Sequence, residues 1–423
     1  MSTLIPDSQS CQTLADWLCY IEHNHPIHQI ELGLERVNTV AGRANLQQLP
    51  GRTVLIGGTN GKGTTCAMLA SILRQADLSV GVYSSPHLLH YNERVQINQQ
   101  DASDASLIEA FCAIEAARGD ISLTFFEYAT LAGLYLFKAA KVDVIILEVG
   151  LGGRLDATNM IDSTATIITS IDLDHQEYLG DTRELVGREK AGVFRPDCLA
   201  IVGEPDLPMS VTEYAHQIGT TLYRVGHEFD YHKDQSHSDQ WHFTSMQQTY
   251  SGLSVPKLPL ANAASVVALL SHIWPHISQQ QINQGLQQAQ LAGRLEQVSE
   301  QPLVLLDVAH NPHAARYLAQ QLQAYQGRRI VALCGMLKDK DITSVLATLA
   351  EQISHWNFVS LDIPRGASAQ TLRQALPNDA CRDRASEFVD ISSAWHAIQT
   401  TVKADDVVIV FGSFYTVAGF KLL

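Results

Sequence analysis

The sequence predicts an α/β protein of two domains, each built on a mostly parallel sheet. Apolar runs of strand length alternate with segments of helical period, which is typical of parallel strands joined by helices. A glycine-rich loop joins one such strand to a helix near residue 60, and a new strand–helix cycle starts after residue 292. The chain has 423 residues, more than one core usually holds. We therefore expect a larger domain over residues 1–292 and a smaller one over 293–423.

The expected elements follow in chain order. In the first domain the predicted strands are Thr53–Ile56, Val80–Tyr83, Val142–Glu148 and Ala165–Ser170, and the predicted helices are Thr64–Gln75, Ser106–Ala117 and Glu127–Ala140. Residues 204–259 are polar and rich in His and Gln, which favours a small antiparallel elaboration before two helical runs, Ala261–Trp274 and Ser278–Gln290. The second domain is expected to contain strands Leu303–Asp307, Ile330–Leu333, Phe358–Leu361 and Val407–Phe411, with helices Pro312–Ala324 and Asp341–Ile353.

Composition narrows the class of protein. The chain is 46% hydrophobic and 17% charged, which suits compact domains rather than disorder. Its formal net charge of −15 disfavours nucleic acid and anionic membranes as partners. Seven cysteines without a CxxC pair indicate reduced, mostly buried thiols. The first 20 residues lack Lys and Arg, and no apolar run is long enough to span a bilayer. We expect a cytoplasmic protein.

The sharpest motif is the glycine-rich run from Gly57 to Thr65. Its glycines let backbone N–H groups wrap phosphate oxygens, and the helix that follows adds a favourable dipole. Lys62 is placed to neutralise β- and γ-phosphates, and Thr64 to face Mg²⁺. The common P-loop spacing would require glycine at Ile56, so this loop is a specialised variant. The alternative is an ordinary glycine-rich turn with a chance lysine.

Three polar residues follow other strands of the same predicted sheet, whose functional loops share one edge. Ser85 lies in a Ser-Ser-Pro-His loop and is a candidate Mg²⁺ ligand, although such loops are more often plain turns. Glu148 ends a buried strand, where a carboxylate needs a cation; Mg²⁺ or a structural salt bridge would satisfy it. His175 follows the next strand and is a candidate ligand of a second Mg²⁺ or a hydrogen-bonded loop residue.

Polar residues also follow strands of the second domain. Asp307 ends one strand and is placed to hold a ribose or a cation, while His310 follows it. Arg294, at the domain boundary, supplies a fixed positive charge able to reach a nucleotide phosphate, and Ser413 follows the last strand. A structural capping role for Asp307 or Asn311 is equally compatible with the sequence.

Taken together, these motifs resemble those of folylpolyglutamate synthases, in particular the bacterial bifunctional dihydrofolate synthase/folylpolyglutamate synthase family of the Mur ligase superfamily. The resemblance runs from about Trp17 to the C-terminus. It is carried by Leu32–Arg36, Thr59–Thr65, Tyr83–His87, Ile121–Glu127, Leu147–Asn159, Gly187–Phe194, Asp307–His313 and Gly412–Phe414.

The resemblance implies a P-loop-type nucleotide-binding N-terminal domain, a Rossmann-like C-terminal domain and ATP bound between them, in a monomer. The implied ATP contacts are Thr59, Asn60, Gly61, Lys62, Gly63, Thr64, Asn262, Arg294 and Asp307. Ser85 and Glu148 would hold one Mg²⁺, and Glu148 and His175 a second, near a carbamylated Lys190; an ordinary Lys–Glu pair is the alternative there. The implied pterin contacts are Thr124, Phe125, Phe126, Glu127, Leu155, Asp156 and Ala157, and His310 and Ser413 would serve the incoming glutamate. Core aromatics at a helix start are the alternative for Phe125 and Phe126.

The implied activity is ATP-dependent ligation of L-glutamate to dihydropteroate and to reduced folates through an acyl phosphate. Two alternative activities are also compatible with the sequence. Another Mur-type ligase would join an amino acid to a cell-wall precursor or polymer. A P-loop nucleotide switch would hydrolyse ATP without glutamate and make no amide.

Overall fold

The structure is a computed structural model that describes residues 8–26 and 30–423. The chain divides into two compact units, Met1–Gln290 and Leu291–Leu423. The division therefore falls close to the expected boundary at residue 292. Each unit has its own sheet and its own core. Among the described residues no helix is both long and apolar enough to cross a membrane.

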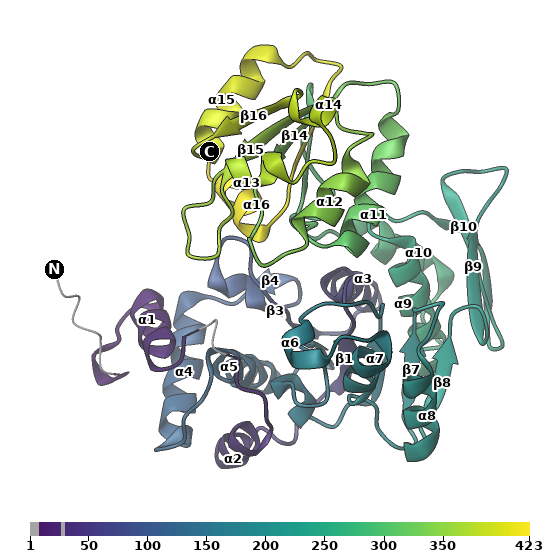
Figure 1. Ribbon diagram of the computed structural model, residues 1–423. Helices are drawn as coiled ribbons and strands as arrows, with labels where there is room; N and C mark the ends of the chain where they lie inside the picture. The colour runs from purple at the N-terminus through teal and green to yellow at the C-terminus, as the bar shows by residue number, and fades with distance from the viewer. Residues whose placement is uncertain (1–7, 27–29) are drawn as a thin grey trace. The chain divides into compact units, whose positions relative to one another are not determined.

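The N-terminal unit is built on an eight-stranded sheet (Figure 1). Its strands are β1 (Arg52–Gly57), β2 (Val80–Tyr83), β3 (Val95–Ile97), β4 (Gln100–Asp101), β5 (Val144–Glu148), β6 (Ala165–Ile168), β7 (Leu199–Val202) and β8 (Thr221–Arg224). Their order is β4-β3-β2-β5-β1-β6-β7-β8, parallel from β2 to β8 and antiparallel at β3 and β4. The loops that follow β1, β2, β5 and β6 thus share one edge of the sheet.

Helices cover both faces of this sheet. They are α1 (Leu14–Asn24), α2 (Glu35–Arg43), α3 (Lys62–Gln75), α4 (Asp104–Arg118), α5 (Phe125–Ala140), α6 (Gln176–Leu179), α7 (Arg183–Ala191), α8 (Met209–Ile218), α9 (Leu260–Ile273) and α10 (Gln279–Gln288), with 3₁₀ turns η1 (Ser8–Ser10), η2 (Tyr91–Arg94) and η3 (Ala157–Met160). Helix α3 packs on β1, β2 and β5, and α9 packs beside α3 on β6 and β7.

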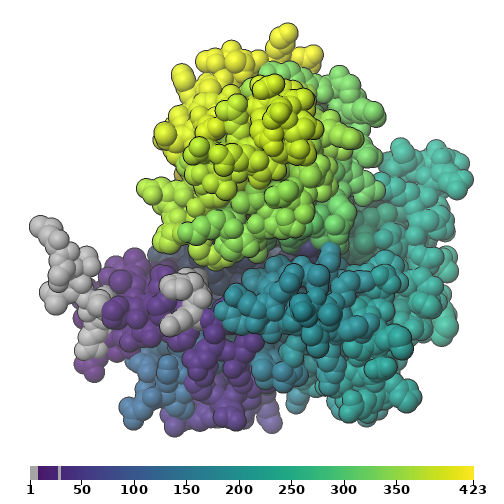
Figure 2. Space-filling model, in the orientation of Figure 1, coloured from purple at the N-terminus to yellow at the C-terminus, as the bar shows by residue number. Residues whose placement is uncertain are grey.

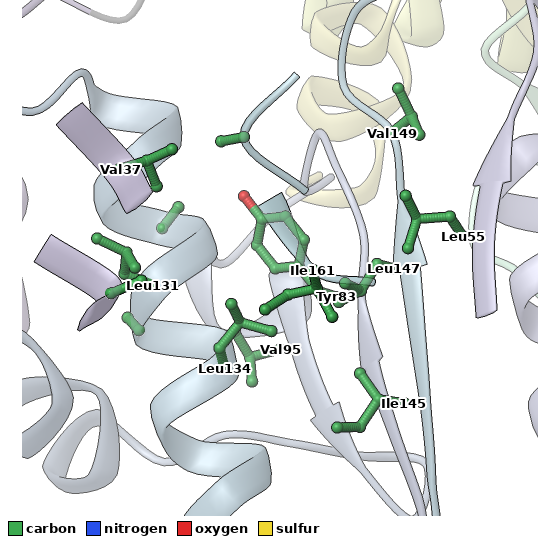
Figure 3. Close-up of a cluster of buried hydrophobic side chains, with 14 of the residues drawn as sticks. Val37, Leu55, Tyr83, Val95, Leu131, Leu134, Ile145, Leu147, Val149 and Ile161 are labelled. Carbon is green, nitrogen blue, oxygen red and sulfur yellow. The ribbon is translucent and has the colours of Figure 1, made fainter. Parts of the chain in front are cut away.

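The α5 face of the sheet holds the largest described core. Ile145 and Leu147 of β5 and Leu131 and Leu134 of α5 belong to this cluster, and Figure 3 shows Tyr83 between the strand and the helix. Successive side chains of a strand point to opposite faces. Glu148, which follows Leu147, therefore points to the α3 side. The alternation along β5 explains why a strand this apolar ends in a carboxylate on the side of the glycine-rich loop.

The antiparallel elaboration is smaller than expected. Of residues 204–259, α8 and β8 belong to the parallel α/β layers, which corrects the prediction for this segment. The separate antiparallel sheet comprises β9 (Phe229–Lys233), β10 (Gln240–Ser245) and β11 (Thr249–Ser254) in the order β11-β10-β9. Figure 1 and the teal atoms of Figure 2 show it at the surface of the N-terminal unit. One buried face, with Trp241 and Phe243 of β10, explains its alternating pattern.

The C-terminal unit contains a six-stranded sheet in which all strands but the first run parallel. Its strands are β12 (Glu296–Glu300), β13 (Leu303–Asp307), β14 (Ile330–Cys334), β15 (His355–Val359), β16 (Ala385–Phe388) and β17 (Val407–Phe411), in the order β12-β13-β17-β14-β15-β16. Its helices are α11 (Pro312–Leu322), η4 (Gln323–Tyr325), α12 (Ile342–Leu349), α13 (Ala369–Gln374), α14 (Asp379–Arg382), α15 (Ile391–Thr401) and α16 (Phe414–Lys421).

The thiols are free but less buried than expected. Cys66, Cys334 and Cys381 are buried, whereas Cys19 and Cys112 are exposed and the other two are intermediate. The two exposed cysteines lie on the outer faces of α1 and α4, because each helix buries only the stripe that meets the core.

Candidate functional site

The glycine-rich loop joins β1 to α3, as the sequence predicts, and ends as the N-cap of that helix at Gly61. Gly58 and Gly61 have φ of 141° and 88°, in the region that favours glycine. A Cβ on Gly58 would lie 1.9 Å from Thr169 Oγ1. Lys62 Nζ donates to the carbonyls of Gly58 (3.0 Å) and Thr59 (3.1 Å). The loop is thus a tight turn with a cation folded over it, at the N-terminus of a 14-residue helix. This arrangement suits polyphosphate.

Residues distant in sequence hold this loop. Asn262, in the first turn of α9, donates from Nδ2 to Thr64 Oγ1 at 2.8 Å. Thr169 Oγ1, after β6, donates to the carbonyl of Asn60 at 2.6 Å. Thr64 Oγ1 in turn donates to the carbonyl of Gly61 at 2.9 Å. The structure therefore brings Asn262 to the loop as expected, and it adds Thr169, which sequence reasoning missed.

Ser85 and Glu148 meet because β2 and β5 are neighbouring parallel strands. The Ser85 N–H donates to Glu148 Oε2 at 3.3 Å, and the Glu148 side chain is buried. The pKa of the Cys66 thiol in α3 is raised by burial and then by the charge of Glu148, which places the carboxylate on the α3 side. Carboxylate, hydroxyl and phosphate oxygens are the ligands that Mg²⁺ prefers, and it keeps several waters. The donors present therefore fit Mg²⁺ bound with a nucleotide.

His175 lies in the loop between β6 and α7, at the start of the short helix α6. It is the N-cap of α6 with φ of 48°, and its side chain is 40% exposed. Its Nε2 lies 3.9 Å from Asp174 Oδ1. Among the described residues no three His, Cys, Asp or Glu side chains are grouped closely enough to hold a metal alone. A second ion at His175 would thus need oxygens from ligand or water.

Lys190 is buried in α7, and its environment is unlike that of a surface lysine. Its neighbour Glu189 pairs with Arg154 instead, at 2.9 Å. Burial, followed by repulsion from Lys62, lowers the pKa of Lys190 to about 7. Asp174 and Asp156 oppose that shift, so Lys62, Asp174 and Asp156 all lie within electrostatic reach of Lys190. Much of the amine is therefore neutral at physiological pH, the form that reacts with CO₂.

Two of the expected pterin contacts cap a helix. Thr124 is the N-cap of α5, and its Oγ1 accepts from the Glu127 N–H at 3.1 Å. Glu127 Oε2 accepts from the Thr124 N–H at 2.7 Å, and its Oε1 pairs with Arg36 at 3.3 Å. This reciprocal pair is a capping box. The pair fixes where the two phenylalanines between them point.

Those two aromatic residues differ in burial. Phe125 is buried against the Tyr91 ring, with centroids 5.9 Å apart, which matches the core alternative. Phe126 is only partly buried, and its ring lies 5.8 Å from that of Tyr83. A Cβ on Gly150 would come within 2.6 Å of Phe126 Cζ, so the glycine makes room for this ring. Phe126 is the better placed of the two to stack on a flat ligand.

Asp156 is buried, and both carboxylate oxygens are engaged by its own loop. Oδ1 accepts from the N–H and hydroxyl of Thr158, at 3.0 and 2.6 Å. Oδ2 accepts from the N–H groups of Gly150 and Leu151, at 3.0 and 2.9 Å. Burial raises the pKa of Asp156 while these bonds lower it. The residue shapes the loop that also contains Leu155 and the buried Ala157.

The C-terminal unit gathers the remaining expected residues around the ends of β13 and β17. Asp307 accepts from the N–H groups of Leu295 (3.0 Å) and Ala309 (2.8 Å). Burial raises its pKa, and the nearby charge of Arg294 opposes the rise. The Arg294 guanidinium lies 5.2 Å from the Phe414 ring centroid, and the His310 ring lies 6.5 Å from it. Arg294 and His310, both expected ligand contacts, therefore lie beside the same Phe414 ring.

Hydrogen bonds define the roles of three residues in that group. His310 Nδ1 lies 2.8 Å from the carbonyl of Val308, so Nδ1 carries the proton in this contact. Ser413 is buried as the N-cap of α16 and accepts from the Thr416 N–H at 3.0 Å. Asn311 is the N-cap of α11, as the capping alternative predicts. Asp307 instead fixes a turn.

Comparison with known proteins identifies the family. Residues 56–256 match the Mur ligase middle domain, and residues 293–414 match the Mur ligase glutamate ligase domain. The chain is 46% identical over 412 residues to the dihydrofolate synthase/folylpolyglutamate synthase of Escherichia coli strain K12, covering 97% of this chain and 95% of the relative. The chain belongs to the dihydrofolate synthase/folylpolyglutamate synthase family. It is an ATP-dependent ligase with a Mur ligase fold, as the sequence predicts.

Solved members of the family share this fold over their whole length. The structure of E. coli FolC in complex with DHPP and ADP matches with a TM-score of 0.93 at 45% identity, covering 99% of this chain and 98% of that one. The Yersinia pestis bifunctional folylpolyglutamate synthase/dihydrofolate synthase complexed with AMPPNP and Mn ion matches with a TM-score of 0.92 at 50% identity, covering 99% of both chains. ATP with a divalent ion is thus the cofactor set of this ligase, in agreement with the expected ATP and Mg²⁺.

Proposed function

We propose that this protein ligates L-glutamate to dihydropteroate, giving dihydrofolate, and to the terminal glutamate of reduced folates. The observation that supports this most strongly is the 46% identity to a bifunctional relative over 97% of the chain. Three features of the N-terminal unit also support the proposal. They are the glycine-rich loop for phosphate, the Ser85–Glu148 pair for a metal ion, and the partly buried Phe126 ring, called the stacking wall below, for a flat acceptor. We also propose that the protein acts as a monomer in the cytoplasm.

Activation of the acceptor carboxylate is the first step. One carboxylate oxygen attacks the γ-phosphorus of ATP, the bond to the bridging oxygen breaks, and ADP leaves as an acyl phosphate forms. Lys62 holds the transferring phosphate together with the N–H groups of Thr59–Thr64. Ser85, Glu148 and His175 are proposed to hold Mg²⁺, which when bound neutralises charge on the phosphates. Asn262 keeps Thr64 in place, and in the C-terminal unit we propose that Arg294 and Asp307 contact the nucleotide.

Amide formation is the second step. The glutamate amine attacks the acyl carbon, loses a proton and expels phosphate. His310 is proposed to orient glutamate through Nε2, since Nδ1 is engaged by the Val308 carbonyl. Ser413 is buried as the N-cap of α16. We therefore propose that Ser413 fixes the N-terminus of this helix, which in turn faces the glutamate carboxylates. No covalent enzyme intermediate is required.

The acceptor is proposed to lie against Phe126, beside Thr124, Phe125, Glu127, Leu155, Asp156 and Ala157. The saturated hydrogen bonds of Thr124, Glu127 and Asp156 indicate that these residues shape the wall, while Phe126 supplies stacking area. Lys190 is proposed to be carbamylated, because its lowered pKa leaves a neutral amine. The resulting carbamate would turn a cation beside Lys62 into an anion able to face Mg²⁺.

One experiment tests the assignment directly. Purified protein is incubated with ATP, Mg²⁺, L-glutamate and dihydropteroate, and separately with tetrahydrofolate, and product masses are measured. We expect one added glutamate on dihydropteroate and at least one on tetrahydrofolate, each with one ADP per amide. ATP hydrolysis that is independent of glutamate would favour a nucleotide switch. Extension of tetrahydrofolate alone would reduce the function to polyglutamylation.

A further inference from the structure

Arg94 carries a positive charge inside the N-terminal unit for which the described residues provide no carboxylate. It is the last residue of η2, and it is 4% exposed. Its Nε–H donates to His87 Nδ1 at 2.9 Å, the guanidinium lies beside the Tyr83 hydroxyl, and no carboxylate of the described residues forms an ion pair with it. An arginine stays charged when buried, so it cannot escape the cost of burial by releasing a proton. Such a group requires an anion.

Aromatic rings hold the guanidinium in place. Its Cζ lies 5.5 Å from the centroid of the Tyr91 ring and 5.5 Å from that of Phe125. These contacts stabilise the cation but supply no hydrogen-bond acceptor. Because Nε is already bonded to His87, the two Nη nitrogens are the donors left for a ligand. A planar pair of donors matches the two oxygens of a carboxylate.

Two neutral donors accompany the arginine. The Tyr83 side chain is fully buried, with its ring in the apolar cluster of Figure 3. Its hydroxyl lies near the Thr130 hydroxyl and the Arg94 guanidinium but forms no hydrogen bond of normal geometry with either. A phenol is protonated at neutral pH, so this hydroxyl carries a proton that it can donate. The bond from Arg94 Nε–H to His87 Nδ1 means that Nδ1 accepts and carries no proton, so this imidazole is neutral. A neutral His87 that accepts at Nδ1 must carry its proton on Nε2, which makes it a donor.

This donor cluster, Tyr83, His87 and Arg94, lies between two parts of the proposed site. The Tyr83 ring contacts Phe126, the proposed stacking wall, at 5.8 Å. The Ser84 N–H donates to the Arg94 carbonyl at 2.9 Å, so Arg94 is bonded to both ends of the loop that carries Ser85. The cluster therefore adjoins both the acceptor wall and the metal loop. An oxygen-rich group of the acceptor is the ligand that would meet these donors.

We propose that Arg94, assisted by Tyr83 and His87, binds the non-reacting α-carboxylate of the glutamate that ends a folate acceptor. The inference rests on the proposed function. A two-oxygen pair with arginine withdraws negative charge from a carboxylate, which makes it a weaker nucleophile toward phosphorus. A glutamylated folate carries a second carboxylate beside the reacting one, whereas dihydropteroate has only the reacting one. Arg94 thus selects glutamylated acceptors and is dispensable for the first ligation.

The test compares two acceptors in the same variants. Arg94→Gln and Arg94→Lys are assayed with dihydropteroate and with tetrahydrofolate, and Arg43→Gln, on the exposed face of α2, is the matched control. For Arg94→Gln we expect kcat/KM for tetrahydrofolate to fall about 10–100-fold, mainly through KM, as expected for a lost bond to a charged group. For dihydropteroate we expect a change of less than about 3-fold. Arg94→Lys should recover part of the loss.

An acceptor analogue gives the decisive second readout. In the analogue, the α-carboxylate of tetrahydrofolate is converted to a carboxamide. With the unaltered enzyme, kcat/KM for this analogue should be lower than for tetrahydrofolate by a similar factor. With Arg94→Gln, kcat/KM for the analogue should fall no further. Equal losses on both acceptors, a weaker ADP affinity by calorimetry, or unchanged kinetics would each overturn the inference. If Arg94→Gln does not fold, Arg94→Lys and Tyr83→Phe decide it, the latter with an expected loss of about 3–10-fold on tetrahydrofolate alone. Failure of the unaltered enzyme to ligate either acceptor would instead refute the proposed function.

Discussion

Replacing Lys190 by methionine should stabilise the fold and abolish ligation. Burial lowers the pKa of Lys190 from the usual 10.5 to about 7. At a pH of about 7.5 the unfolded lysine is charged and the folded one mostly neutral, so folding must release a proton. With about 1.4 kcal/mol per pKa unit, this release costs on the order of 4 kcal/mol. Methionine has similar length and no charge, so we expect Lys190→Met to raise the free energy of unfolding by about 2–4 kcal/mol.

The pH dependence of the free energy of unfolding independently tests whether Lys190 destabilises the fold. Between pH 7 and 10 the unfolded chain binds a proton at Lys190 that the native chain does not, so native stability rises with pH over this range. The Lys190→Met variant has no such titration at this position, because methionine does not ionise. The advantage of Lys190→Met should therefore fall from about 4 kcal/mol at most near pH 7 to below about 1 kcal/mol near pH 10. Urea unfolding at pH 7, 8.5 and 10 would measure it, with ligation of dihydropteroate assayed in parallel.

Two results would refute this reasoning. A Lys190→Met protein that is less stable than the parent at pH 7 would mean that the lysine stabilises the fold. A stable variant with near-normal ligation would remove Lys190 from the reaction. If stability rises and activity is lost, the amine is kept for function at the expense of stability, as is common for buried ionisable groups in active sites.

Four further substitutions test the structure. Lys62→Ala and Glu148→Ala should each slow ligation by orders of magnitude while circular dichroism and the unfolding midpoint stay near those of the parent; near-normal turnover would remove that residue from the mechanism. Asp156→Ala frees four donors that now bond its carboxylate, so we expect the loop to loosen and dihydropteroate ligation to fall more than tetrahydrofolate ligation; equal losses in steady-state kinetics would contradict distinct pterin poses in one site. Arg118 binds Glu115 at 2.6 Å and donates to the hydroxyls of Tyr20 and Tyr128, so Arg118→Met should cost about 2–4 kcal/mol of unfolding free energy by urea titration; a loss below about 0.5 kcal/mol would show that the cluster adds little.

The sequence determined what depends on near neighbours in the chain. The run from Gly57 to Thr65 combines a buried strand, residues suited to positive φ and the first turn of a helix, so its motif survives any change in distant packing. The sequence also predicted a site at Glu148, because burying an unpaired carboxylate at the end of an apolar strand costs free energy unless a cation binds it. Helix α1 was not predicted, although Thr13 and Asp16 form a capping box at its start. Only three residues of α1 are buried, against nine in α3, so its apolar pattern is much weaker.

Only the tertiary structure decided which of these residues meet. Asn262 reaches Thr64 across 198 residues because α9 packs beside α3, and no local pattern encodes that contact. Lys190 reads as one of several charges in a polar helix, and only its burial in α7 reveals a lysine that is half neutral near pH 7. Arg94 belongs to a polar tetrapeptide without periodicity; its charge acquires meaning from the rings around it. Sequence patterns specify elements and turns, whereas pKa shifts and unmatched charges arise from desolvation, which exists only after the chain has packed.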